Sequence, residues 1–152
     1  MTVEKRRGGG IVLGTLTVRH GAESAGRVRR HLVDELLRSG LSGSAVDDAA
    51  LLVTELVTNA VRYARPLPGD VLRVSWDLVG GRLLLKVTDG GGGDGPRRQD
   101  AGPRDTRGRG LAIVDAVAVR WGVDRDNGNR STVWAELPAP VSGNGSGGLG
   151  RS

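Results

Sequence analysis

One short segment constrains this chain more than any other part of the sequence. Residues 51 to 64 have the pattern of an amphipathic helix, because apolar side chains recur at the spacing that lines one helix face. Glu55 and Asn59 lie four residues apart in this segment, so they stack on a common face, one turn from each other. The apolar face consists of Leu52, Leu56, Ala60 and Tyr63.

Glu55 and Asn59 together suit a cation site. Mg²⁺ takes few oxygen ligands from a protein and relies on substrate phosphates for the rest, so a carboxylate and a carboxamide oxygen on one helix face would fit it. Solvent-facing helices also carry a Glu and an Asn by chance. The interpretation as a metal site therefore depends on the motifs that follow in the chain.

Two glycine motifs follow the helix in a fixed order. Strand-like runs cover Val71 to Leu78 and Leu83 to Val87, and the second leads through Thr88 into Asp89-Gly90-Gly91-Gly92-Gly93. A second motif, Gly108-Arg109-Gly110, then opens another apolar helix, and a final strand-like run covers Ser131 to Leu137. The order is a helix with Glu-x-x-x-Asn, a strand that ends in Asp-x-Gly-x-Gly, a loop, and Gly-x-Gly-Leu at a helix start.

This order resembles the GHKL superfamily of ATP-binding domains, which includes gyrase, heat-shock chaperone, histidine kinase and mismatch-repair ATPases. The resemblance covers roughly residues 10 to 138. The run Thr54 to Val61, Thr-Glu-Leu-Val-Thr-Asn-Ala-Val, is most similar to the stand-alone anti-sigma factor serine kinases of bacteria. The fold that this implies is an α/β two-layer sandwich, in which a mixed, mostly antiparallel sheet is covered on one face by three helices.

The resemblance gives roles to three polar side chains. Asn59 matches the residue whose oxygen ligates Mg²⁺, and Glu55 matches the candidate general base for a Ser hydroxyl or a water. Asp89 matches the acid that binds adenine, because an ionised carboxylate accepts the N6–H proton, whereas guanine has a carbonyl oxygen there. Taken alone, Asp-Gly is also a common turn pair.

The first glycine motif matches the part of the family's pocket where backbone passes close to the base. Gly91 and Gly93 lack a Cβ atom, which permits this approach. The family usually has a larger apolar residue just after these glycines, whereas this chain has Asp94 and Gly95. The segment that contains them, residues 90 to 107, corresponds to the family's ATP lid.

The second motif implies a phosphate site at the start of the helix expected over Leu111 to Val119. Free backbone N–H groups and the helix dipole favour an anion there. The matching residues are Gly108, Arg109, Gly110 and Leu111, with Arg107 as a second candidate cation. Thr132 matches the nucleotide-contacting Thr of the family's last strand, and it is equally compatible with an ordinary strand residue. The implied cofactors are ATP and Mg²⁺.

Composition excludes several classes of protein. The chain has no Cys, so it has neither a disulfide framework nor a thiolate metal site. It has no long apolar run and no signal-like apolar segment, so we expect a cytoplasmic protein without a membrane segment. Its net charge of +5 comes from Arg residues spread among acidic ones, with no zinc-finger or helix-turn-helix spacing, which disfavours nucleic acid as a partner.

The remaining sequence sets the limits of the domain. Residues 1 to 9 are expected to be disordered, residues 10 to 138 to form the ATP-binding domain, and residues 139 to 152 to form a disordered Gly, Ser and Pro tail. Within the domain, residues 11 to 19 are expected to form a strand and residues 23 to 38 a helix.

The helix expected over residues 23 to 38 has a basic face, which either is simply solvated or docks a partner. Its arginines are Arg27, Arg29, Arg30 and Arg38. Ser44 with Asp47 resembles a capping box for the next helix. His20 and His31 have no motif around them, and no phosphoacceptor helix pair precedes the ATP domain, so a complete histidine kinase is not expected.

Two functions remain open at this point. The first is an ATP-dependent serine/threonine protein kinase that phosphorylates an anti-sigma-antagonist-like protein and binds a sigma factor. Proteins of the family that it resembles often form homodimers. The second is a catalytically weak, ATP-responsive switch that holds a protein partner. The pair of Glu55 and Asn59 favours the kinase, and the altered lid favours the switch.

Overall fold

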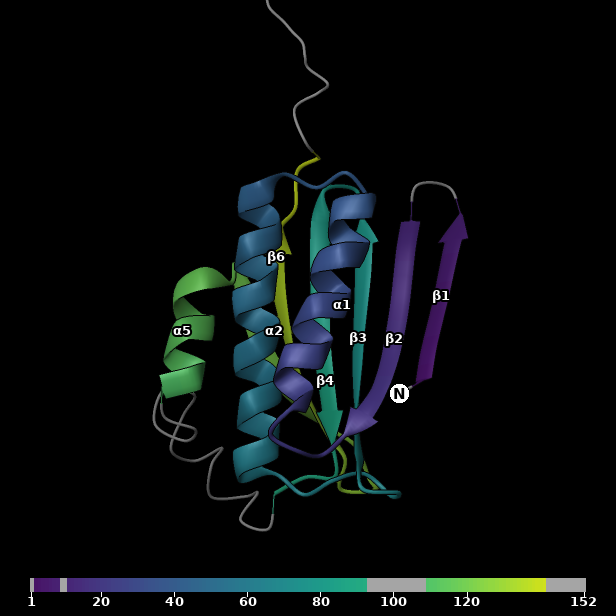
Figure 1. The fold of residues 1–152 in the computed structure, drawn as a ribbon. Coiled ribbons are helices and arrows are strands. Elements are labelled where there is room, and N and C mark those ends of the chain that lie inside the picture. Colours follow the sequence, from purple (N-terminus) through teal and green to yellow (C-terminus); the bar gives the residue numbers. More distant parts are fainter. Residues whose placement is uncertain (1, 9–10, 93–108, 142–152) are drawn as a thin grey trace, which may run out of the picture.

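The computed structural model describes residues 2 to 8, 11 to 92 and 109 to 141, and these form one sheet with helices on one of its faces (Figure 1). The sheet has six strands in the order β1-β2-β3-β4-β6-β5. The strands are β1 (Thr2–Gly8), β2 (Ile11–Arg19), β3 (Val71–Val79), β4 (Arg82–Asp89), β5 (Arg120–Arg125) and β6 (Ser131–Pro138). The helices are α1 (Ser24–Arg38), α2 (Gly43–Tyr63) and α5 (Arg109–Val117).

The predicted two-layer fold is confirmed. Every pairing between the described strands is antiparallel, so this part of the sheet contains no parallel pair. The helices lie side by side over one face of the sheet, with α2 between α1 and α5 (Figure 1). Because α2 contacts both neighbouring helices and both β4 and β6, it is the central element of the helical layer.

Side chains alternate along the strands between a face that the helices cover and an open face. In β4 and β6 every second residue is buried, which is the period of a strand with one solvated face. The covered residues include Leu83, Leu85, Val133 and Leu137, and they pack against the apolar stripes of the helices. Burial of each such side chain contributes roughly 1.5–3 kcal/mol, so this single core accounts for most of the favourable free energy of folding.

Trp76 is the largest fully buried side chain, and it needs a glycine beside it. Gly14 lies opposite Trp76 in the pairing of β2 with β3, and a Cβ atom there would come within 2.3 Å of the indole ring. The chain has no Phe, so this indole supplies aromatic volume to a core otherwise built from Leu, Val and Ala.

The predicted hairpin at Gly80 and Gly81 is confirmed. The two glycines connect β3 to β4 with φ angles of 58° and 79°. Two consecutive positive φ angles are typical of the tight turn that matches the twist of two antiparallel strands. The strand predicted over residues 11 to 19 is also confirmed as β2.

Both ends of the domain differ from the prediction. Thr2–Gly8 forms β1, an edge strand along β2, because the backbone edge of β2 offers hydrogen-bonding groups whatever the side chains are. At the other end, Ala139 is buried, and Val141 forms a bridge with Leu41. The tail beyond residue 141 and the segment 93 to 108 lie outside the described residues.

Two local predictions for α2 are wrong. Its N-cap is Ser42, whose Oγ accepts a hydrogen bond from the Ala45 amide at 3.2 Å, so Ser44 is not the cap. Tyr63 does not line the apolar face: it is the last helical residue, and it is 46% exposed.

Within the described residues, no helix is both long and apolar enough to cross a membrane.

Candidate functional site

Asp89 ends β4 and begins a tightly held turn. The residue is buried, and its Oδ1 accepts a hydrogen bond from the Gly91 amide at 2.7 Å. On the outer side of the turn, Arg65 exchanges two backbone hydrogen bonds with the glycines. The Gly90 amide donates to the Arg65 carbonyl at 2.7 Å, and the Arg65 amide donates to the Gly91 carbonyl at 2.8 Å. The turn therefore has a fixed shape before any ligand binds.

Gly91 is required by both its conformation and its surroundings. Its φ is 88°, and a Cβ atom would lie 2.1 Å from the Asn129 carbonyl oxygen. A Cβ atom on Gly90 would lie 2.1 Å from the Pro66 carbonyl oxygen. Backbone from two other loops thus packs directly against this turn. The glycines permit close packing of the protein around Asp89, whereas the predicted approach of this backbone to a base stays a prediction.

Asn59 places a buried oxygen on the same helical layer. Its side-chain Nδ2 donates to the Glu55 carbonyl at 3.1 Å. Because a carbonyl only accepts hydrogen bonds, the side-chain atom of Asn59 that contacts it must be the amide nitrogen, and the second terminal atom of the side chain is therefore Oδ1. Asn59 is 4% exposed, and its Oδ1 has no hydrogen-bond partner among the described residues. An orphaned buried oxygen of this kind fits a cation or a water bound to one.

The surroundings of Asn59 limit what kind of metal site is possible. In the described part of the chain, no group of three or more His, Cys, Asp or Glu residues could hold a metal ion. A metal at Asn59 would therefore take most of its ligands from water and from a bound phosphate, which suits Mg²⁺ better than Zn²⁺. Glu55 lies one helical turn before Asn59 and is partly exposed, so its carboxylate is accessible at the surface of α2.

Helix α5 brings the second glycine motif toward α2. The helix begins at Arg109 and ends at Val117, two residues earlier at each end than predicted. Leu111 and Val114 are buried in the core, and α5 contacts α2. The backbone of Arg109 and Gly110 therefore forms the first turn of a firmly packed helix. Gly93, Arg107 and Gly108, together with the side chain of Arg109, lie outside what the structure describes.

Thr132 lies on the face of the sheet that the helices do not cover. Its Oγ1 is 2.8 Å from Thr88 Oγ1, and both threonines belong to the alternating set that the helices do not cover. The residue opposite Asp89 is Ser131, which is 1% exposed and lies on the covered face. Its hydroxyl has no partner among the described residues. The role of Thr132 therefore stays a prediction, and Ser131 is a second candidate hydroxyl, which the sequence analysis did not single out.

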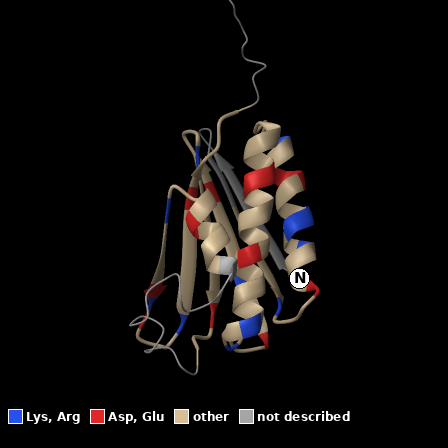
Figure 2. Ribbon diagram, turned by 90° about the vertical axis from the view of Figure 1, so that its left-hand side faces the viewer, with Lys and Arg blue, Asp and Glu red and all other residues tan. Residues whose placement is uncertain are grey.

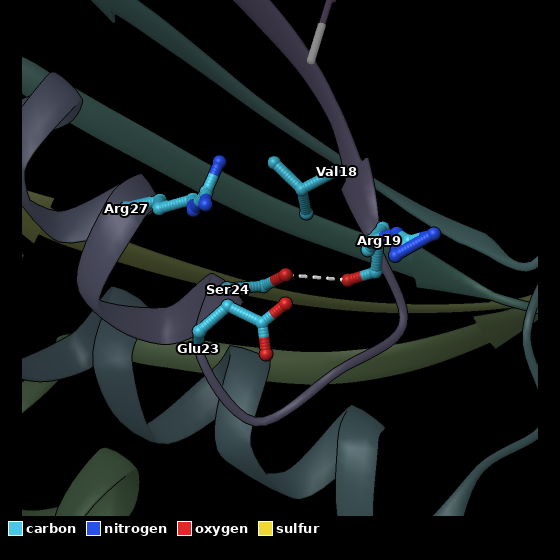
Figure 3. A pocket seen from close by; sticks show the side chains of 5 residues that line it. All are labelled: Val18, Arg19, Glu23, Ser24 and Arg27. Carbon is cyan, nitrogen blue, oxygen red and sulfur yellow. Dashed lines mark hydrogen bonds between the residues drawn. The ribbon is translucent and has the colours of Figure 1, made fainter.

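A second polar surface lies along α1. Basic positions lie along this helix, which carries blue segments in Figure 2. Arg27, Arg29 and Arg30 are exposed, and within the described part of the chain none of them forms an ion pair. A cavity of about 350 Å³ opens beside the start of the helix, where Ser24 Oγ donates to the Arg19 carbonyl at 2.5 Å (Figure 3). Its lining residues are Val18, Arg19, Glu23, Ser24 and Arg27.

A shallow hollow of about 460 Å³ extends this surface along the same helix. It is lined by Arg27, Arg30, His31 and Asp34. Arg27 lines both spaces, so the hollow and the cavity adjoin each other in a groove along α1, whose charged lining residues are three arginines and two acids. This groove contains none of the residues of the Asp89 turn or the Asn59 site.

Comparison with known proteins agrees with this geometry. Residues 18–137 match the family model of the histidine kinase-like ATPase domain. None of the curated proteins searched matches the chain. Among solved structures, the chain is similar to the crystal structure of the RsbU and RsbW domains of Rv1364c from Mycobacterium tuberculosis, with a TM-score of 0.63 and 20% sequence identity.

That structural match covers 84% of this chain but only 34% of the other chain, so this chain spans about a third of the length of that protein. The match supports the fold of this chain alone. The family match is stronger evidence, because it spans more than half of the chain and includes α2, the Asp89 turn and β6. An ATPase domain of this type implies nucleotide binding. The family predicted from the sequence is therefore confirmed, and the chain belongs to the histidine kinase-like ATPase domain family.

Proposed function

We propose that this protein is an ATP-binding regulator that transfers phosphate to a serine or threonine of a protein partner. The observation that carries the proposal is the buried, orphaned Oδ1 of Asn59 on the helix that also presents Glu55. Burying a polar atom without a partner is costly, so such atoms in a native protein call for a functional explanation. Membership of an ATPase family supplies one, since Mg²⁺ bound with ATP would satisfy this oxygen.

The roles of the side chains follow from their chemistry. The Asp89 carboxylate accepts the N6–H of adenine, while its turn holds the base against Gly91. Ser131, opposite Asp89, adds a hydroxyl that can donate or accept at the same edge of the base. When bound, Mg²⁺ would neutralise phosphate charge, with Asn59 among its ligands. Glu55 would orient the attacking hydroxyl and take its proton.

The groove along α1 is our candidate for the partner-docking surface. Arg19, Arg27 and Arg30 outnumber Glu23 and Asp34 there, so the groove suits an acidic protein surface. By the resemblance to anti-sigma factor kinases, the partners would be a sigma factor and an anti-sigma-factor antagonist, in the cytoplasm. The similarity to a structure described as containing an RsbW domain supports this assignment.

Nucleotide binding is tested by titrating the protein with Mg·ATP and Mg·GTP by calorimetry, with Asp89→Asn as the matched variant. Asn keeps an oxygen that can accept from the Gly91 amide, but it places an amide donor toward the donor on adenine. We expect ATP to be preferred over GTP and the preference to be lost in Asp89→Asn. Equal binding of both nucleotides by the wild type would contradict the role of Asp89.

Phosphotransfer is tested by mixing Mg·[γ-³²P]ATP with the protein and a candidate antagonist. Glu55→Gln should lower transfer by at least about a hundredfold, as expected for loss of a general base, while ATP affinity stays within about twofold. The alternative function is an ATP-responsive switch with negligible turnover. A partner complex that depends on ATP but yields no phosphoprotein with the wild type would establish the switch instead.

A further inference from the structure

His20 makes an unusual contact with the C-terminal end of α2. Its imidazole Nε2 lies 2.9 Å from the Ala64 carbonyl oxygen and 3.2 Å from the Ala60 carbonyl oxygen. Both carbonyls can only accept, so Nε2 carries the proton and one N–H is shared between them. The Ala64 carbonyl lies at the C-cap, where the helix itself supplies no donor, whereas the Ala60 carbonyl also accepts from the Ala64 amide at 3.1 Å. A side chain that lies more than 40 residues away in sequence from Ala64 supplies the donor here.

The same residue also holds the far end of the connection between α2 and β3. The His20 backbone amide donates to the Asp70 carbonyl at 3.0 Å. Asp70 has a φ of 64°, a left-handed conformation that is uncommon for non-glycine residues and that Asp adopts more readily than most. One residue therefore fixes both ends of the segment from Ala64 to Asp70, through its side chain and through its backbone.

This segment is the one that holds the Asp89 turn. Arg65 directly follows Ala64, and its backbone exchanges two hydrogen bonds with Gly90 and Gly91, at 2.7 and 2.8 Å. At the helix end, Ala60 directly follows Asn59. The His20 imidazole is thus linked to the Asp89–Gly91 turn through Ala64 and Arg65. It is linked to Asn59 through Ala60.

We propose that His20 is a positioning residue that keeps the Asp89–Gly91 turn in the conformation that binds nucleotide. The nucleotide part of this inference rests on the proposed function. Without the imidazole, the end of α2 and Arg65 are free to move, and the turn populates other conformations. Apparent affinity falls in proportion to the fraction of protein that is competent to bind.

Two substitutions at this position separate the contact from the bulk of the side chain. His20→Gln keeps an N–H donor that is as many bonds from Cβ as Nε2 of His. In His20→Asn the amide nitrogen is one bond closer to Cβ, so it cannot reach both carbonyls. Ser39→Ala is the control, because Ser39 Oγ donates to the Glu35 carbonyl at 3.0 Å at the end of α1, away from the turn.

The first measurement is amide hydrogen exchange by NMR in nucleotide-free protein, below the unfolding transition of each variant. We expect the Arg65 and Gly90 amides to exchange at least about tenfold faster in His20→Asn, and at nearly wild-type rates in His20→Gln and Ser39→Ala. If both amides of His20→Asn exchanged at the same rates as in the wild type, the proposal would be overturned. Equally fast exchange in His20→Gln would also overturn it, because the contact would then not depend on the donor.

The second measurement is Mg·ATP affinity by calorimetry on the same variants. We expect a loss of about tenfold in His20→Asn, or about 1.4 kcal/mol of binding free energy, and recovery in His20→Gln. Faster exchange with unchanged ATP affinity would show that the turn does not position the nucleotide, and would overturn the proposal. If wild-type protein binds no ATP, the proposed function fails, while the exchange experiment still decides whether His20 holds the turn.

Discussion

Asp89 and Ser131 lie directly opposite each other on β4 and β6, and both side chains face the helical layer. Thr88 precedes Asp89 in the chain, Thr132 follows Ser131, and these two threonines also lie opposite each other. Their hydroxyl oxygens are 2.8 Å apart on the open face. The two pairs are neighbours in sequence but are separated by the thickness of the sheet. From this arrangement we propose that Ser131, rather than Thr132, contacts the base.

Ser131→Ala should weaken ATP binding by about three- to tenfold, the range expected for the loss of one neutral hydrogen bond. Unfolding stability should not fall, because the variant removes a buried hydroxyl that has no partner among the described residues. Thr132→Val is the matched control: it removes a hydroxyl on the other face and should leave affinity unchanged. Calorimetry and urea unfolding measure both quantities, and a larger affinity loss in Thr132→Val would reverse the assignment.

Gly91→Ala should destabilise the protein by about 2–4 kcal/mol, since it combines a positive φ with a severe clash. The φ angle is 88°, and the new Cβ atom would lie 2.1 Å from the Asn129 carbonyl oxygen. Gly69→Ala isolates the conformational part, because Gly69 has a φ of 90° and open space around it. That variant should lose only about 1–2 kcal/mol. Equal losses in urea unfolding would show that the contact with Asn129 does not matter.

Local patterns predicted the elements of this fold well because their causes are local. The run over residues 11 to 19 has strand composition, and Gly80-Gly81 permits two positive φ angles, so β2 and the hairpin could be read from the sequence. The spacing of Glu55 and Asn59 predicted that they lie one turn apart on a helix, and α2 contains both, with Asn59 buried and Glu55 partly exposed. β1 was missed because Thr2–Gly8 has little apolar alternation and is held through the backbone of β2.

The limits of prediction at the candidate site come from contacts between distant parts of the chain. Thr132 was named by its match to a motif, and a motif does not specify strand register, although a shift of one residue moves a side chain to the opposite face. His20 has no motif around it, and its contacts with Ala60 and Ala64 depend on how the loop after β2 packs against α2. Neither feature leaves a signal in the neighbouring sequence.

Glu136 should make stability depend on pH on the open face of the sheet. A hydrogen bond from Arg120 at 2.7 Å, together with Arg82, holds the pKa of the Glu136 carboxyl below its ordinary value. A carboxyl whose pKa is lowered by folding stabilises the protein above its unfolded-state pKa. That contribution is lost as the pH falls through the lowered value.

Urea unfolding of wild type and Glu136→Gln checks this dependence. The difference in stability between the two proteins should be constant from pH 7 to about 5 and should shrink as the pH falls further. It should also shrink at pH 7 in about 1 M salt, because exposed ion pairs are screened. A difference that stays the same down to pH 2 would mean that the charge of Glu136 contributes nothing.

Asn59→Leu should separate ligand binding from folding. Leu has the same number and branching of side-chain heavy atoms as Asn, and it removes both the Nδ2–H bond to the Glu55 carbonyl and the Oδ1 that has no partner among the described residues. The Glu55 carbonyl keeps its position within α2, where helical hydrogen bonding satisfies it. We therefore expect stability in urea to stay within about 1 kcal/mol of wild type, because exchanging a partly satisfied buried polar group for an apolar one is nearly neutral.

Nucleotide binding should respond differently to the same change. Wild type should bind ATP more tightly with Mg²⁺ than with EDTA, whereas Asn59→Leu should bind equally weakly in both conditions, because the ion has lost its protein oxygen. Calorimetric titrations in the two buffers measure this. If Asn59→Leu instead lost more than about 2 kcal/mol of stability and kept its response to Mg²⁺, the buried amide would serve the packing of α2, and the cation would be held elsewhere.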